Sequence, residues 1–258
     1  MKVYRYWATL PVTTSREGKE FCVYVRGYSN ESEEAALRHA EQRKEDFLNH
    51  VQTGEPYELA NETLREEVLR ELDMPQATPA VITRNRYGCQ VLNTTDVIMT
   101  DHDLGASYEY FPIPFLPIVF SGTATKDSQQ LHEQIRSCVQ KLGLSARLYS
   151  TRKGIRCIIT NQTLPAGSSE CIRLLRKLKC DAQYTHMTRI QRCYRARLTP
   201  KPLRIKCPYP PVKFPYPTPK AKEYFHEWLV NYEKQAAQFA TCQFLEQIGV
   251  PPKHDRIR

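Results

Sequence analysis

Two aspartates, Asp101 and Asp103, end the apolar run DVIMTDHDL at residues 96–104. Side chains alternate along a strand, so both carboxylates are expected on one face of the strand and His102 on the other. Two like charges held together repel each other, and a bound divalent cation offsets that repulsion. The pair therefore predicts a metal site. The alternative is a strand that ends in solvent, where Asp is a common terminator.

A basic turn in YSTRKGIRCIITN, residues 149–161, supplies the second element of a site. Cations and free backbone amides around Gly154 suit a triphosphate, and the alternative is an ordinary basic hairpin tip. The cations near this turn are Arg147, Arg152, Lys153 and Arg156. Alternation puts Ile155, Cys157 and Ile159 on one face. Arg156 is then expected on the open face, with Asp101 and Asp103.

Asp181 and a basic stripe complete the candidate residues. Asp181 is a candidate third carboxylate for two-metal phosphoryl chemistry, and the alternative is a loop or helix-capping residue. The stripe lies in RIQRCYRARLTPKPLRIK, where no acid falls between residues 182 and 222. We expect it to contact phosphates, with the Tyr194 ring stacking on a base. The alternative is a solvated edge. Its cations are Arg189, Arg192, Arg195, Arg197, Lys201, Arg204 and Lys206.

The composition favours a polyanionic partner, because 37 Lys and Arg against 28 Asp and Glu give a formal charge of +9. No stretch has the length and apolarity of a membrane span, and the first residues lack the features of a secretory signal. The nine cysteines form no Cys-x-x-Cys pair, so we read them as small buried hydrophobes in a reducing compartment. We therefore expect a cytoplasmic protein.

The elements that must position these residues follow from periodicity and turn signals. Two strands are expected within residues 1–30 around Gly18, then a helix over 32–51. A second helix is predicted from Leu64, Val68 and Leu72, ended by Pro75. Residues 80–104 predict two strands with a turn at Tyr87 and Gly88. The proline-containing residues 105–122 predict a loop across the sheet, with PIVF (117–120) as a short extended piece.

The second half of the chain alternates helices and strands. We expect a helix from Asp127 or Ser128 to Leu142, a hairpin turning at Lys153 and Gly154, and a helix from Ser168 or Ser169 to 179. Residues 184–198 predict an extended run, residues 199–219 a proline-rich arm, and residues 218–248 a final helix. This order indicates an α+β fold with helices on one face of a sheet. The expected units are an N-terminal αβ lobe (1–79), a sheet core (80–206) and an arm with a C-terminal helix (207–258).

The order of VIMTDHD, STRKGIRCII and Asp181 followed by YRARLTPKP resembles the motifs of archaeo-eukaryotic primases and primase-polymerases. The resemblance covers roughly residues 80–206. It implies an RRM-like, primase-like mixed sheet. It also implies Asp101, Asp103 and Asp181 as catalytic metal ligands for Mg²⁺ or Mn²⁺, and Arg156 at the nucleotide-phosphate position. Arg156 stands where that superfamily typically has His, which puts catalysis in question. The same blocks also resemble a family of uncharacterised bacterial proteins, which implies no function.

Together these features predict a divalent-metal-dependent nucleotidyltransferase, primase-like or polymerase-like, that uses nucleic acid and nucleoside triphosphates. Lys153, Arg152 and Arg156 would bind the triphosphate, and the stripe would hold the template or primer backbone. The alternative is a non-catalytic protein that binds single-stranded nucleic acid on a degenerate primase-like fold. A third possibility is an adaptor that binds another protein through the proline-rich arm and the last helix.

Overall fold

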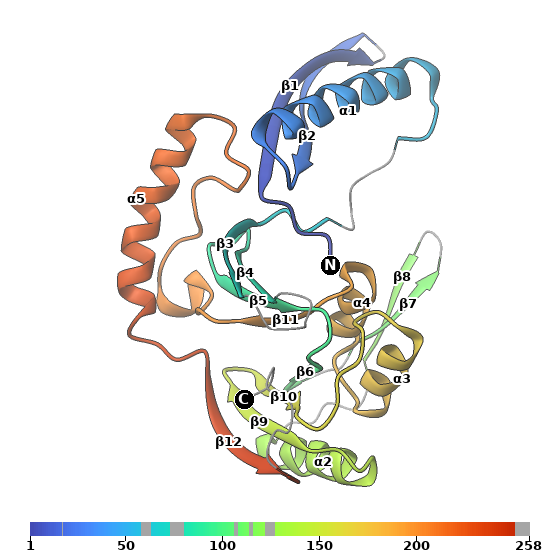
Figure 1. Ribbon diagram of the computed structural model, residues 1–258, viewed down its shortest axis with the longest axis vertical. Helices are drawn as coiled ribbons and strands as arrows, with labels where there is room; N and C mark the ends of the chain where they lie inside the picture. The colour runs from blue at the N-terminus through green and yellow to red at the C-terminus, as the bar shows by residue number, and fades with distance from the viewer. Residues whose placement is uncertain are drawn as a thin grey trace.

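The computed structural model describes residues 1–16, 18–57, 63–72, 80–105, 108–113, 116–121 and 127–250 (Figure 1). The helices are α1 (Glu33–Thr53), α2 (Ser128–Lys141), α3 (Ser169–Lys177), α4 (Ala182–Gln191), α5 (Pro219–Ala236) and the 3₁₀ turn η1 (Pro202–Ile205). The strands before α2 are β1 (Tyr6–Arg16), β2 (Lys19–Ser29), β3 (Glu67–Leu72), β4 (Ala80–Arg84), β5 (Gln90–Thr94), β6 (Met99–Asp103), β7 (Tyr108–Ile113) and β8 (Leu116–Ser121). The later strands are β9 (Ala146–Thr151), β10 (Gly154–Ile159), β11 (Tyr194–Arg197) and β12 (Cys242–Ile248). The predicted α+β class is confirmed.

The N-terminal unit is the predicted hairpin and helix. β1 and β2 pair antiparallel along their full length, and Gly18, with φ of 78°, supplies the left-handed turn residue. The Ser32 side chain accepts a hydrogen bond from the Ala35 amide and caps α1. α1 lies along β2, and a Cβ at Gly27 would overlap the helix backbone. Gly27 therefore permits the close approach of helix and hairpin.

The predicted helix over residues 64–72 is wrong, because β3 occupies residues 67–72. It pairs antiparallel with β4, with an irregularity between Val68 and Arg70. Every residue of β4 is buried, so both of its edges need backbone partners, and a helix would leave one edge unpaired. This tertiary requirement overrides the helical spacing of the apolar residues. Pro75, the expected helix terminator, lies outside the described residues.

Apart from the separate β7–β8 hairpin, the strands from residue 67 onward divide between two four-stranded sheets, whereas one sheet was expected. Their orders are β11-β5-β4-β3 and β12-β9-β10-β6. All of their strand pairings are antiparallel, so neither is the mixed sheet that the resemblance implied. In Figure 1 the β11-β5-β4-β3 sheet lies above the β12-β9-β10-β6 sheet, and the chain passes from one to the other between β5 and β6.

The main core lies on one face of the β12-β9-β10-β6 sheet. Ile155, Cys157 and Ile159 point into it and are at most 1% exposed, as the alternation predicted. α2 and α3 have the predicted caps, Asp127 and Ser168, and contribute buried residues to the same core. The face of the sheet that carries Arg156 is therefore turned away from this core.

The predicted extended run over residues 184–198 is wrong for its first half, which forms α4. The side chain of Asp181 accepts a hydrogen bond from the Tyr184 amide at 2.7 Å and caps this helix. Thr185 and Thr188 have β-branched side chains of the kind common in strands, but their hydroxyls donate to the carbonyl oxygens four residues earlier. Only Tyr194–Arg197 is extended, as β11.

The predicted loop over residues 105–122 contains a hairpin, β7 and β8, in which Pro112 lies opposite Pro117; the expected extended piece, residues 117–120, falls within β8. A two-stranded hairpin has free edges, where residues without an N–H are tolerated. Pro114 lies outside the described residues.

The C-terminal segment packs back on the molecule. Thr218 caps α5, as predicted, and the Trp228 ring stacks on the fully buried Tyr232, whose hydroxyl donates to the Pro200 carbonyl at 2.7 Å. α5 ends at Ala236, whereas the sequence predicted a helix to residue 248; β12 follows and pairs with the outer edge of β9. In the described part of the chain, none of the helices has the length and apolarity to cross a membrane.

Candidate functional site

A pocket of about 90 Å³ lies where the tip of the β9–β10 hairpin meets β6, β11 and η1. We call it the Asp101 pocket. The sequence predicted eight of its lining residues as site residues: Asp101, Asp103, Arg152, Lys153, Arg156, Arg197, Lys201 and Arg204. Residues as far apart in the sequence as Asp101 and Arg204 therefore converge at one place. The lining pairs two carboxylates with six cations.

β6 presents its two carboxylates as the alternation predicted. Asp101 and Asp103 line the pocket, while His102 points the other way and is 3% exposed. The His102 ring lies 2.7 Å from the Thr100 hydroxyl and 3.1 Å from the Lys179 carbonyl. Burial lowers the pKa of His102 to about 4. His102 is therefore a neutral core residue outside the site.

The neighbouring strand, β10, places Arg156 directly opposite Asp101 and Gly154 opposite Asp103. The Arg156 guanidinium approaches the Asp101 carboxylate at 3.3 Å, and Arg156 is only 8% exposed. Its Nε is buried without a hydrogen-bond partner among the described residues. A side chain at Gly154 would overlap the His102 carbonyl, so only glycine permits this approach of the strands. Asp103 consequently has no side chain opposite it.

The remaining cations come from the other sheet and the proline-rich arm. Arg197 ends β11, Lys201 precedes η1 and Arg204 lies within η1. The Arg152 side chain donates to the Arg204 carbonyl at 2.9 Å and ties the hairpin tip to η1. Burial, and then Arg204, lower the pKa of Arg197. Burial, Arg197 and Arg204 lower the pKa of Lys201.

Among the ion pairs of the described residues, none involves Arg197, Lys201 or Arg204. No described carboxylate lies within ion-pair distance of these three cations, which therefore repel one another, and an anionic ligand would relieve that repulsion. Phosphate oxygens fit this arrangement, since Arg and Lys both bind them.

Asp103 has a raised pKa, caused by partial burial and then by the charges of Asp101 and Asp181, against the opposing effect of Arg204 and Lys153. Asp181 therefore influences the site electrostatically, because its negative charge raises the pKa of Asp103. Its amide donates to the Asp101 carbonyl at 2.8 Å, but its carboxylate caps α4 and is absent from the pocket lining. The capping alternative for Asp181 is thus confirmed.

No group of three or more acidic, His or Cys side chains suited to a metal ion occurs within the described ranges. Asp101 and Asp103 remain as a pair of hard oxygen donors. Proteins usually hold Mg²⁺ through one or two carboxylates together with substrate phosphates. The pair therefore fits Mg²⁺ or Mn²⁺.

The cations of the predicted basic stripe do not share one surface, and Lys206 is exposed outside the pocket lining. Arg197, Lys201 and Arg204 line the Asp101 pocket, whereas Arg189 and Arg192 are exposed around the end of α4, outside the lining. The prediction that Tyr194 stacks on a base is wrong. Its ring is fully buried, and its hydroxyl donates to the Leu164 carbonyl at 3.2 Å and to Cys171 Sγ at 3.0 Å.

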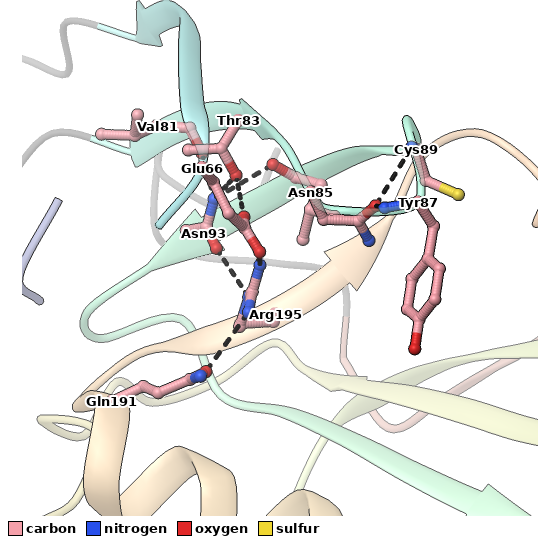
Figure 2. A network of polar contacts seen from close by, with 10 residues as sticks. Glu66, Val81, Thr83, Asn85, Tyr87, Cys89, Asn93, Gln191 and Arg195 are labelled. Carbon is pink, nitrogen blue, oxygen red and sulfur yellow. Dashed lines mark hydrogen bonds and ion pairs between the residues drawn. The ribbon is translucent and has the colours of Figure 1, made fainter. Parts of the chain in front are cut away.

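Arg195 belongs to a buried polar network (Figure 2). Its guanidinium donates to both oxygens of Glu66, at 2.6 and 2.5 Å, and to Asn93 Oδ1 at 2.8 Å. Glu66 also accepts from the Thr83 hydroxyl at 2.6 Å. The network joins β4, β5 and β11 to the residue before β3. Arg195 therefore holds the sheet together, and its guanidinium is not free for phosphate.

Sequence reasoning missed the part of the lining that follows α5. Phe239, Ala240 and Thr241 border the pocket, although this stretch was expected to continue the helix. It also missed a cross-strand row on the open sheet face. In that row Asp101 lies opposite Arg156, Arg156 opposite Tyr149, and Tyr149 opposite the 54% exposed Phe244. No sequence signal placed β12 beside β9.

No family model, curated protein or solved structure matches this chain. Function must therefore be argued from the chemistry of the site, since a fold class alone does not define an activity.

Proposed function

We propose that this protein is a divalent-metal-dependent nucleotidyltransferase that acts on nucleic acid, with the Asp101 pocket as its active site. One observation carries the proposal: two carboxylates on one strand lie in the same pocket as cations that lack carboxylate partners. Carboxylates without such cations would suit a simple metal site. Cations without carboxylates would suit simple phosphate binding. Their combination suits a metal–triphosphate complex.

The cations divide the work of binding phosphate. Arg197 lines the pocket from β11, Lys201 and Arg204 line it from the arm, and Lys153 and Arg152 line it from the hairpin tip. Fixed cations around a transferring phosphoryl group stabilise charge that develops in the transition state. Arg156 is the positioning residue, because its guanidinium holds the Asp101 carboxylate at 3.3 Å and is itself almost fully buried.

Asp101 and Asp103 would hold the divalent ion, Mg²⁺ or Mn²⁺. When bound, such an ion polarises phosphate oxygens and lowers the pKa of an attacking hydroxyl. The mutual repulsion of the Asp101 and Asp103 carboxylates favours a cation there. An Arg at position 156 cannot serve as a general base at neutral pH. The attacking hydroxyl must therefore be activated by the ion or by a carboxylate.

A second candidate function is binding of single-stranded nucleic acid without catalysis. It is favoured by the six-to-two excess of cations in the pocket and by the engagement of Asp101 with Arg156. The exposed Phe244 ring lies beside Tyr149, with ring centroids 5.7 Å apart, and gives the same sheet face a surface on which a base can stack.

A cytoplasmic location is part of the proposal. Its support is that all nine cysteines are free and five of them are buried, as expected in a reducing compartment.

Nucleotide incorporation on primed and unprimed single strands, with Mg²⁺, Mn²⁺ or EDTA, tests the proposal. We expect metal-dependent product from the wild type that falls about 100-fold or more in Asp103→Asn, because a charge-stabilising ligand is lost. Asp46→Asn, on the exposed side of α1, is the matched control and should match the wild type. Equal product from Asp103→Asn would refute the active-site assignment. Tight strand binding without product would establish the binding function instead.

A further inference from the structure

The N-terminal unit carries a second, larger groove of about 420 Å³, which we call the N-terminal groove. It shares no residue with the Asp101 pocket and lies within the range of about 300–1,000 Å³ typical of ligand sites. β1, β2, α1 and the segment around Thr63 contribute to it. Aromatic rings and arginines dominate its lining: Trp7, Tyr24, Tyr28, Phe47, Tyr57, Arg26, Arg43 and Arg65, with Val23, Val25 and Thr63.

Two arginines of the N-terminal groove, Arg26 and Arg65, have no acidic partner among the residues that the structure describes. The lining that the structure describes contains no Asp or Glu, and none of the ion pairs of the described residues involves Arg26 or Arg65. Arg26 Nε is buried without a hydrogen-bond partner in the described part of the chain. Burial, and then the charge of Arg65, lower the pKa of Arg26. Several other buried or partly buried arginines of the protein do have acidic partners. Arg84 pairs with Glu233, and Arg195 pairs with Glu66.

The rings of the groove are held in place by contacts with one another. Trp7 and Tyr28 have centroids 5.3 Å apart, and Phe47 and Tyr57 meet edge to face at 5.6 Å. Arg43 lies over the Tyr57 ring and donates to its hydroxyl at 2.9 Å. Preorganised rings lose little conformational entropy when a planar ligand stacks on them.

Tyr24 presents the most accessible ring. Its side chain is 52% exposed, and it shares one face of β2 with Arg26 and Tyr28, at positions i, i+2 and i+4. Arg26 donates from Nη1 to the Tyr24 carbonyl at 3.3 Å, but its buried Nε has no partner among the described residues and the Tyr24 ring is left exposed. A ligand that offers both a flat apolar surface and an anion would satisfy both groups.

We propose that the N-terminal groove is a binding site for single-stranded nucleic acid, in which bases stack on the aromatic rings and phosphates contact Arg26 and Arg65. Stacking platforms interleaved with arginines are how proteins hold single strands without reading their sequence. A peptide added to the free edge of β2 is the main competing ligand, but its backbone carries no charge to neutralise the arginines. This site is independent of the proposed activity of the Asp101 pocket.

Trp7 gives a direct readout, because the chain has only one other tryptophan, Trp228, which stacks on Tyr232 away from the groove. In a Trp228→Phe background, titration with oligothymidylate or oligouridylate should quench the fluorescence of Trp7. If that background does not fold, binding of a labelled strand to the full chain is followed by fluorescence anisotropy, and the groove's share is the part of the signal that is lost in Tyr24→Ala.

Matched variants separate stacking from charge. Tyr24→Ala should weaken strand binding about tenfold, whereas Tyr224→Ala, at a ring that is 49% exposed on α5, should not change it. Arg65→Ala should lower the salt slope of binding by about 0.7, and Arg38→Ala, an exposed change on α1, should not.

Three results would overturn the proposal. The first is that Tyr24→Ala changes neither the quenching of Trp7 fluorescence nor the anisotropy of the labelled strand. Another is an equal loss of binding in Tyr24→Ala and Tyr224→Ala. The third is inorganic polyphosphate or polyglutamate that quenches Trp7 as strongly as the oligonucleotide at equal charge, because stacking would then contribute nothing. The nucleotide-incorporation assay is read separately, so failure at the groove leaves the active-site proposal standing.

Discussion

Arg195 and Arg197 lie two residues apart on β11 and share one face of the strand, yet the structure gives them opposite roles. Arg195 is bound by Glu66 and Asn93, whereas Arg197 lines the Asp101 pocket among other cations. We predict that Arg195→Met reduces stability and leaves phosphate binding in place. Arg197→Met should do the reverse.

The expected size of the first effect follows from the burial of Glu66. Removing Arg195 leaves Glu66, 8% exposed, with the Thr83 hydroxyl as the one donor to its carboxylate among the described residues. Breaking a buried ion pair from one side costs about 3–5 kcal/mol. Because the Arg195 side chain is 21% exposed, we expect a loss of about 3 kcal/mol in the free energy of unfolding. Arg197 has no carboxylate partner, so its replacement should change this free energy by less than about 0.5 kcal/mol or raise it.

Urea unfolding and the salt dependence of single-strand binding measure the two effects. Arg197→Met should lower the salt slope by about 0.7, the value for one lost phosphate contact on a single strand. Glu66→Gln combined with Arg195→Met should recover part of the lost stability, because no unpaired buried charge remains. The reasoning fails if Arg195→Met is as stable as the wild type. It also fails if the two single variants lower the salt slope equally.

Two further predictions concern pH. Because burial lowers the pKa of His102 to about 4, the unfolded chain takes up a proton there that the folded chain does not, and stability should fall as pH drops from 6.5 to 4. His102→Gln should remove up to about 1.4 kcal/mol of this loss per pH unit, measured by urea unfolding across that window; an unchanged pH dependence would contradict the burial argument. Because the pKa of Asp103 is raised, its ionised form is disfavoured in the folded state, so Asp103→Asn should stabilise the protein at pH 7. That difference should vanish below about pH 3.8, and a destabilised variant at pH 7 would show that the Asp103 carboxylate has a favourable partner.

Much of the candidate site was predictable, because it depends on local rules. Strand alternation placed Asp101, Asp103 and Arg156 on one face, and the glycine turn placed Lys153 at the hairpin tip. These inferences need only the period of a strand and the position of a turn. Local sequence carries both.

Other predictions failed where distant pairing decides the structure. Residues 64–72 and 242–248 have patterns that also suit helices. β3 forms instead because the buried strand β4 needs a partner at its edge, and β12 forms because the edge of β9 needs one. Tyr194 and Arg195 illustrate the same limit at the level of single residues. A run of cations and aromatics does not reveal which members will meet a buried glutamate or enter the core.

The Asp101 pocket depends on both sheets, which links the stability of one to the chemistry of the other. The carboxylates and Arg156 belong to β6 and β10, whereas Arg197 comes from β11, which pairs with β5. Arg195 fixes β11 through Glu66 and Asn93, and Arg197 follows two residues later on the same face. The buried network therefore sets where a cation stands relative to the carboxylates. A change at Glu66, which does not line the pocket, should reach the site through the register of β11.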